Sequence, residues 1–419
     1  MSRSLRFLLS FFLITTASAV VAPAAFAAQA PPFFIVEKDR VTPVPAGDGQ
    51  AKNQFGAPMD TLTQRLARER TFTTQLFNKD GSATVVPGQP RAAAAVSPDE
   101  CLEIDTGEPN FQHKDRFSSC RTYGFGIGRP EDGSLTFLVT TAYTAATDGT
   151  QGIRADVYIH DGQVEGNPPP EWYGTQVGIQ VMCSAISTSC STSDMTLKTM
   201  GEWVTGEHRF WQTIIPSGTT TARDGKAFYE VGQTFYDPVT NTRPVIDRTD
   251  FFRCDTATYI PGAAQGCVFT ARTPVMNFGP VRSKYPDIVD HIAAAQYHPE
   301  TTKPGTFTLI PGSVEAGTPL TRLYPAYDTA TYNRNHAKAV ATCVEFWGTG
   351  YTQGGTLDCD EYPFRSTYQG AAYSDNGGTV GYSAKPIALS QNRSAGNDVG
   401  TFYKDYRILD SDGYFVSAT

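Results

Sequence analysis

The hydrophobic positions between residues 99 and 278 predict a series of short β-strands. Apolar runs, or apolar residues alternating with polar ones, recur there between turn-forming Asp, Gly, Asn and Pro residues. The clearest runs are residues 135–139, 155–159, 177–181, 208–215 and 226–236. Short strands at such spacing are typical of a β-sandwich. We therefore expect an all-β, sandwich-like N-terminal domain over residues 99–278.

This β-rich segment shows no catalytic motif. Its histidines, His113, His160 and His208, are scattered, and no serine or carboxylate pattern of a catalytic triad lies near them. Trp172 and Tyr173 follow three prolines, and they either form a binding patch or belong to the core of the sandwich. The sequence thus predicts an accessory domain whose ligand is unknown.

The hydrophobic pattern changes in the C-terminal part of the chain, residues 279–419, where helical and strand periods are mixed. The expected elements are helices at 287–295 and 333–347, strands ending near residue 362 and spanning 385–389, and a helix that begins near Asn392. We therefore expect an α+β C-terminal domain that includes the order strand, strand, helix.

The first 27 residues have the pattern of a secretory signal peptide. Arg3 and Arg6 precede an apolar run, and small residues close it at Ala25 and Ala27. A membrane anchor is the alternative, but polar residues and Pro23 interrupt the run, and no later stretch is apolar enough to span a bilayer. We expect a secreted, extracellular protein without stable membrane association.

Residues 28–98 are rich in Pro and Ala, with one expected helix at about 59–77. This segment is either a pro-segment that masks a partner surface or a linker that carries a transient helix.

The eight cysteines fall into four pairs of sequence neighbours, and none has the Cys-x-x-Cys spacing of a zinc ribbon. Disulfides that close each local loop are the simplest arrangement, and they fit an oxidising compartment. The candidate pairs are Cys101 with Cys120, Cys183 with Cys190, Cys254 with Cys267, and Cys343 with Cys359.

The net charge of −8 counts against a DNA-packaging protein, since tight non-specific DNA binding comes from a basic surface. Residues 280–419 are also slightly acidic, with eleven Lys and Arg against fourteen Asp and Glu. The balance does not exclude a turnover enzyme, because a divalent metal ion supplies positive charge where a phosphate binds.

Three acids crowd into four positions at Asp358, Asp360 and Glu361, and Pro363 follows them. Adjacent carboxylates repel, so a fold gathers them mainly where a metal, a proton transfer or a basic partner stabilises them. A solvated turn before the proline is the alternative. Asn392 and Arg393 then add an amide that suits hard cations and a guanidinium that suits phosphate. Together these groups suggest metal-assisted phosphodiester chemistry.

Two segments carry a family resemblance. Asp-Cys-Asp-Glu-Tyr-Pro-Phe at 358–364 and Asn-Arg-x-Ala-Gly-x-x-Val-Gly at 392–400 resemble the secreted deoxyribonucleases of the NucA/NucB family. The resemblance extends upstream to Lys-Tyr-Pro at 284–286 and His-Ile at 291–292. The chain departs from the family pattern at Ser394, at Asp398 and over residues 365–370, where the family has an acidic, glycine-rich stretch. The resemblance implies a ββα-metal-type nuclease core and a divalent metal, Mg²⁺ or Mn²⁺.

The resemblance and the residue types imply roles for individual side chains. Asp360 is the expected base, and Asp360 and Asn392 are the expected metal ligands. For Asn392, the alternative is that it caps the start of a helix. Arg393 either grips a phosphate or is an exposed residue without a role. Glu361 either takes part in catalysis or lies on the opposite face of the strand from Asp360 and pairs with a structural arginine or lysine. His291 either assists the leaving group or is a packing residue.

The sequence predicts a secreted, metal-dependent endonuclease that hydrolyses extracellular DNA with little sequence preference. One alternative is a cell-surface or polymer-binding adhesin with a degenerate nuclease-like domain. The other is an exported antibacterial nuclease toxin, for which an inhibitor or immunity protein would be a partner.

Overall fold

The structure is a computed structural model, and it describes residues 34–36, 84–85, 95–104, 111–129, 133–146, 149–185, 188–218, 220–236, 241, 245–376 and 380–418. The expected signal peptide and the expected helix at 59–77 lie outside these residues.

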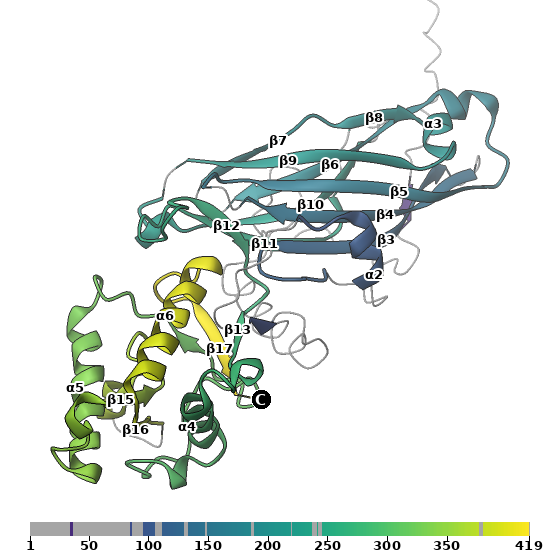
Figure 1. Ribbon diagram of the computed structural model, residues 1–419. Coiled ribbons are helices and arrows are strands. Elements are labelled where there is room, and N and C mark those ends of the chain that lie inside the picture. The colour runs from purple at the N-terminus through teal and green to yellow at the C-terminus, as the bar shows by residue number, and fades with distance from the viewer. Residues whose placement is uncertain are drawn as a thin grey trace, which may run out of the picture.

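The β-rich region is built from two antiparallel sheets (Figure 1). The first contains, in spatial order, β1 (Phe34–Val36), β3 (Ser118–Arg129), β4 (Gly133–Ala145), β5 (Ile153–Glu165), β9 (His208–Ser217) and β7 (Ser189–Thr192). The second contains β12 (Gly266–Phe269), β11 (Val245–Asp255), β10 (Ala227–Tyr236), β6 (Gln176–Ala185) and β8 (Thr196–Thr199). The prediction of a β-rich region is confirmed.

Apolar side chains from both sheets share one interior. Leu135, Phe137 and Val139 alternate with less buried residues along β4 and pack in a cluster that includes Ile179 of β6. Because successive side chains of a strand point to opposite faces, one row from each sheet is buried between the layers. Trp172 also lies in this cluster, so it is a core residue rather than part of a binding patch.

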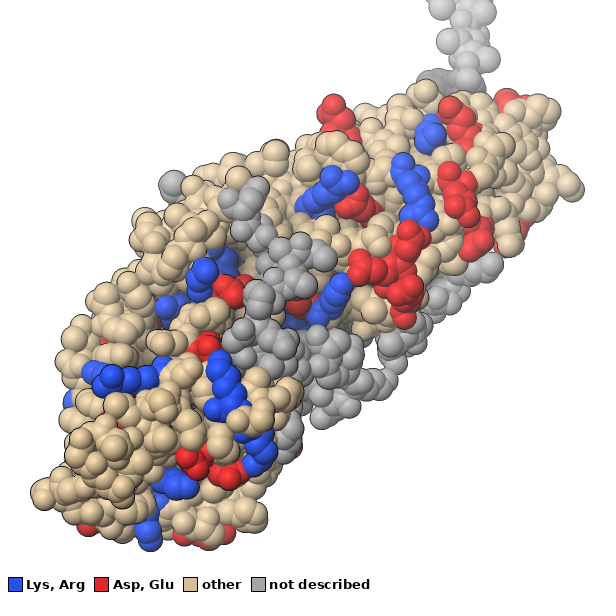
Figure 2. All heavy atoms as spheres, viewed as in Figure 1, with Lys and Arg blue, Asp and Glu red and all other residues tan. Residues whose placement is uncertain are grey.

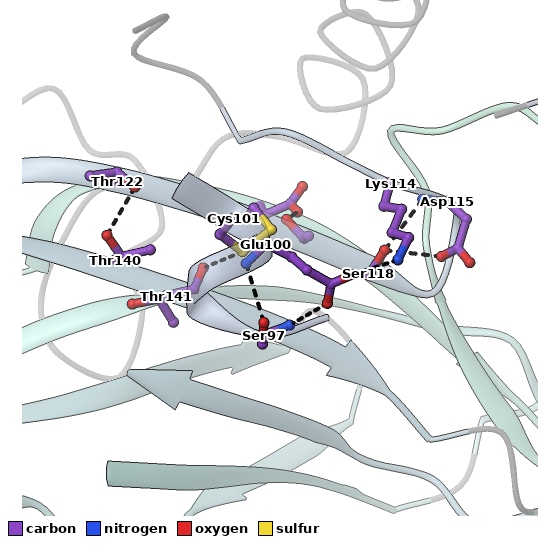
Figure 3. Close-up of a disulfide and its surroundings, with 12 residues drawn as sticks. Ser97, Glu100, Cys101, Lys114, Asp115, Ser118, Thr122, Thr140 and Thr141 are labelled. Carbon is purple, nitrogen blue, oxygen red and sulfur yellow. Dashed lines mark hydrogen bonds and ion pairs between the residues drawn. A yellow bond between two sulfur atoms is a disulfide. The ribbon is translucent and has the colours of Figure 1, made fainter. Parts of the chain in front are cut away.

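All four predicted disulfides are present: Cys101–Cys120, Cys183–Cys190, Cys254–Cys267 and Cys343–Cys359. The first attaches a short helix, α2 (Pro98–Ile104), to β3 (Figure 3). Ser97 and Glu100 form a reciprocal pair at the start of α2. The Ser97 Oγ accepts from the Glu100 N–H at 3.2 Å, and the Glu100 carboxylate accepts from the Ser97 N–H at 3.0 Å. A second short helix in this region is α3 (Met200–Val204).

The C-terminal region contains three longer helices around a small hairpin (Figure 1). In chain order its elements are β13 (Val275–Asn277), α4 (Pro286–Tyr297), β14 (Leu320–Thr321), α5 (Thr329–Trp347), β15 (Leu357–Tyr362), β16 (Ser383–Ala388), α6 (Leu389–Asp405) and β17 (Gly413–Ser417). A four-stranded sheet has the order β14-β17-β13-β2, with β2 at Thr84–Val85, and β15 pairs with β16. Short 3₁₀ turns occur in both regions: Pro170–Gly174 and Arg223–Gly225 lie in the β-rich region, and the C-terminal region has Gly279–Val281, Pro299–Thr301, Gln353–Gly355 and Ala371–Asn376. The predicted α+β character is confirmed, whereas the boundary at residues 278/279 and the ββα-metal class stay predictions.

Two helices begin earlier than the sequence predicts. The α5 helix starts at Thr329 because the Asp328 side chain caps it by accepting a hydrogen bond from the Thr331 N–H. The α6 helix starts at Leu389, with Ala388 at the N-cap position, so Asn392 already lies inside the helix. The capping interpretation of Asn392 is therefore wrong.

A buried ion network joins the β-rich region to the segment after α6. We call it the inter-region network, and its members are Arg116, Lys226, Arg253, Asp255, Arg407 and Asp412. The Arg253 Nη1 lies 2.6 Å from the Asp412 Oδ2, and the Arg407 Nε lies 2.9 Å from the Asp255 Oδ2. Since these charges are paired across the two regions, the network holds the end of α6 against β11.

Candidate active site

The β15–β16 hairpin presents its acidic residues on two sides. Asp360 hydrogen-bonds to α4 on one side, whereas its neighbour Cys359 is joined by a disulfide to Cys343 of α5. Because strand side chains alternate, Glu361 points to the same side as Cys359 and away from Asp360. This arrangement agrees with the expectation that the two adjacent carboxylates lie on opposite faces.

Asp360 is held by a histidine from a distant helix. Its Oδ2 lies 2.6 Å from the Nδ1 of His291, and the Nε2 of His291 lies 2.6 Å from the Oγ of Ser383 on β16. Asp360 is 7 % exposed, His291 2 % and Ser383 0 %. Asp358 makes no hydrogen bond to Asp360 among the described residues, and its Oδ1 accepts the N–H of Cys359 at 2.9 Å.

Glu361 has a strongly perturbed acidity. Burial is the main cause and the negative charge of Asp360 the next, and together they raise the pKa of Glu361 to about 8, although Arg365 opposes the shift. Arg365 does not pair with Glu361: its Nε donates to the Tyr332 carbonyl at 3.2 Å, and its Nη2 donates to the Asn333 Oδ1 at 3.0 Å. The expected structural cation for Glu361 is therefore not in ion-pair contact within the described residues.

Asn392 and Arg393 lie in the first turns of α6, which packs against both strands of the hairpin. Asn392 is half-buried and Arg393 is exposed. Within the part of the chain that the structure describes, neither side chain has a hydrogen bond or ion pair that would occupy it. A side chain added at Gly396 or Gly400, farther along the same helix, would meet open space. This part of α6 is thus open to a ligand.

Two of the departures from the family pattern, Ser394 and Asp398, take part in one set of contacts between the start of α4 and α6. The hydroxyl of Tyr285, just before α4, lies 3.1 Å from the Ser394 Oγ and donates to the Asp398 Oδ2 at 2.6 Å. Lys284 also donates to Asp398, at 3.1 Å. Ser394 and Asp398 therefore tie α6 to the start of α4.

The residues present suit a hard divalent cation only in part. The Oδ1 of Asp360 and the side-chain oxygen of Asn392 are hard oxygen donors, and neither has a hydrogen-bond partner within the described residues. No group of three His, Cys, Asp or Glu side chains arranged to hold a metal occurs among the described residues. A cation here would therefore take most of its ligands from water and phosphate, as Mg²⁺ commonly does.

The surface charge and the hydropathy of the helices do not point to a further binding site. Figure 2 shows Lys and Arg interspersed with Asp and Glu on the face that it presents, rather than one continuous basic field. None of the described helices is long and apolar enough to cross a membrane.

Comparison with known protein families gives one match. Residues 315–417 match the family model described as deoxyribonuclease NucA/NucB. The C-terminal region carries a NucA/NucB domain. The match covers about a quarter of the chain and includes Asp360, Glu361, Asn392 and Arg393, so the resemblance read from the two motifs is confirmed. No curated protein and no solved structure matches the chain.

The match to NucA/NucB begins at residue 315, so the α4 helix, which precedes that residue, lies outside it. Sequence reasoning included His291 through the His-Ile resemblance but did not connect it to Asp360. It missed Ser383 altogether, because a single serine in a short strand belongs to no motif. The assigned roles of Asp360, Glu361, Asn392 and Arg393 stay predictions.

Proposed function

We propose that this protein is a secreted, metal-dependent endonuclease that cleaves extracellular DNA with little sequence preference. The observation that carries the proposal is the NucA/NucB match, whose motif residues lie on a hairpin and on the helix packed against it. Four disulfides support an oxidising, extracellular location.

Each proposed residue has a chemical task. A bound Mg²⁺ or Mn²⁺ would neutralise charge on the phosphoryl oxygens. Asp360, with one oxygen held and the other unpaired, would take the proton of the attacking water, and Asn392 would hold the cation. Arg393, exposed on α6, binds a phosphate of the DNA backbone. Burial raises the pKa of Glu361 to about 8, which favours its protonated form, but its side chain points away from Asp360, so a direct catalytic role for Glu361 stays a prediction.

The substrate preference follows from what the chain offers to DNA. Phosphate contacts position a nucleic acid without reading its sequence, and we find no base-reading motif. The adhesin and toxin alternatives, an inhibitor or immunity partner and a ligand for the β-rich region stay predictions, and no contact in the described structure favours any of them.

The test is nicking of supercoiled plasmid by the full disulfide-bonded chain, with Mg²⁺ or Mn²⁺ and then with EDTA. We expect cleavage that needs the metal, falls to a small residual rate in Asp360→Asn and is strongly reduced in Asn392→Ala. Asp290→Asn is the matched control, because Asp290 is an exposed residue of α4 that pairs with Arg282. If the folded wild-type chain leaves the plasmid intact with both metals, the proposed function is wrong.

A further inference from the structure

The proposed base of the nuclease sits at one end of a buried hydrogen-bond chain that spans three elements. Asp360 of β15 bonds to His291 of α4, and His291 bonds to Ser383 of β16, each at 2.6 Å. The three residues are far apart in the sequence, with separations of 69 and 92 positions from His291. Such a chain forms only when the helix packs onto the hairpin.

The donor and acceptor roles in this chain follow from the chemistry of imidazole. A carboxylate only accepts, so the Nδ1 of His291 carries a hydrogen and donates to the Asp360 Oδ2. The Nε2 would accept from the Ser383 hydroxyl if the ring is neutral and would donate to the Ser383 Oγ if it is protonated. Both ring nitrogens are occupied, and the ring cannot rotate without losing both bonds.

The order Ser, His, Asp is that of a nucleophilic triad, but the burial excludes that role. Ser383 is 0 % exposed and His291 2 %, so neither a phosphodiester nor a water molecule reaches the serine oxygen or the ring. The same burial excludes His291 as the base that activates water, which is the usual role of histidine in many nucleases. Of the three hydrogen-bonded residues, Asp360 has the largest exposed fraction.

We infer that His291 and Ser383 are positioning residues that orient Asp360 for the proposed nuclease reaction. The bond from His291 fixes the Oδ2 and thereby the plane of the carboxylate. The Oδ1, which makes no hydrogen bond within the described residues, is then the oxygen left for the attacking water or the cation. A catalytic group that is already held in the reactive orientation does not have to lose rotational freedom in the chemical step, so the barrier is lower. This inference rests on the proposed function.

The site is consequently incomplete without α4, although the NucA/NucB match begins only after that helix. The α4 helix is also tied to α6, since the Asp287 N–H donates to the Gln391 side chain at 3.2 Å and Gln391 donates back to the Asp287 carboxylate at 2.8 Å. One helix thus contacts both the strand of the proposed base and the helix of the proposed metal ligand.

The test uses steady-state cleavage of a labelled DNA duplex by the full chain with Mg²⁺. We expect His291→Ala to lower kcat by about 10- to 100-fold, as loss of a partner that orients a catalytic ligand does. KM should change little, because His291 does not reach the substrate. His291→Asn should recover part of kcat, since its amide N–H lies near the lost Nδ1–H. Ser383→Ala should lower kcat less than His291→Ala.

Two comparisons separate positioning from a merely structural role. Because His291 acts through Asp360, adding His291→Ala to Asp360→Asn should lower the residual rate no further. His298→Ala is the matched control, as His298 is an exposed histidine just after α4 and should leave kcat unchanged. Melting temperatures measured beside the kinetics show which variants are folded at the assay temperature.

Several results would overturn the inference. One is full kcat in folded His291→Ala while Asp360→Asn keeps only its small residual rate, which leaves the proposed function standing. Another is an additive loss in the double variant, which would give His291 a task of its own. If His291→Ala does not fold, unchanged kcat in Ser383→Ala together with no activity in folded His291→Asn would also contradict it. A wild-type chain that does not cleave DNA would instead refute the proposed function itself.

Discussion

Removing the charge of Asp412 should destabilise the protein by several kcal/mol, because this carboxylate is the acceptor shared by the inter-region network. Its two oxygens lie 2.7 and 2.6 Å from the Arg253 Nη1, and its Oδ2 also accepts the Leu409 N–H at 3.0 Å. Lys226 lies 3.2 Å away and Arg116 3.5 Å away. In Asp412→Asn the volume is kept, but Lys226 and Arg116 lose the carboxylate that pairs with them, and Arg253 keeps only Asp255, at 3.3 Å.

The expected size follows from the burial of these groups. The Arg253 side chain is 3 % exposed and that of Asp412 11 %. Breaking a buried ion pair by removing one partner costs about 3–5 kcal/mol, because the remaining charge is desolvated and unpaired. The matched control is Asp290→Asn, whose partner Arg282 is exposed, and there we expect a loss below about 1 kcal/mol.

The stabilisation by Asp412 should depend on pH in one direction. Burial raises the pKa of Asp412, but the charges of Arg253, Lys226 and Arg116 outweigh burial and hold that pKa well below its ordinary value. An unfolded Asp has a pKa of about 3.9, so the stabilisation by Asp412 is fully present above that pH and is lost as the pH falls through the lower folded-state pKa. The difference between wild type and Asp412→Asn should therefore shrink in acid.

The assay is equilibrium unfolding of the full chain in guanidinium chloride, with disulfides intact, at pH 7 and at pH 2.5. Circular dichroism and tryptophan fluorescence should be recorded together, since separate transitions would show that the two regions unfold independently. A loss below about 1 kcal/mol at pH 7, or the same loss at both pH values, would refute the argument from buried charge.

Three further predictions concern the candidate site. Glu361→Gln should stabilise the folded chain above pH 5, and most above pH 8, by on the order of 3 kcal/mol. The reason is that ionising a carboxyl with a raised folded-state pKa destabilises the fold as the pH rises from its unfolded pKa of about 4.5 to about 8. Thermal melts across this pH range check the prediction. Replacing Cys343 and Cys359 together by serine should cost about 2–4 kcal/mol and lower nuclease activity, since the bond ties β15 to α5; chemical unfolding and plasmid nicking would show whether stability and activity fall together. Asn392→Ala should raise the Mn²⁺ concentration needed for half-maximal cleavage with a smaller change at saturating metal, and an unchanged metal titration would remove Asn392 from the metal site.

Much of the local structure could be read from the sequence. Alternating hydrophobic positions predicted the β-rich region, helical spacing predicted α4 and α5, and cysteines close in sequence predicted all four disulfides. These features depend on neighbours within about twenty positions, so a linear pattern records them. The two motifs likewise predicted the family, because each is a short continuous segment.

Only the tertiary structure decided which distant side chains meet. The α6 helix begins at Leu389, directly after β16 ends at Ala388, so Asn392 lies inside the helix and not at its cap. The contact of Asp360 with His291, and the pairing of Asp412 with Arg253, join positions 69 and 159 residues apart. No periodicity encodes such pairs, because a buried hydrogen bond or ion pair forms only where packing excludes water and brings complementary groups together.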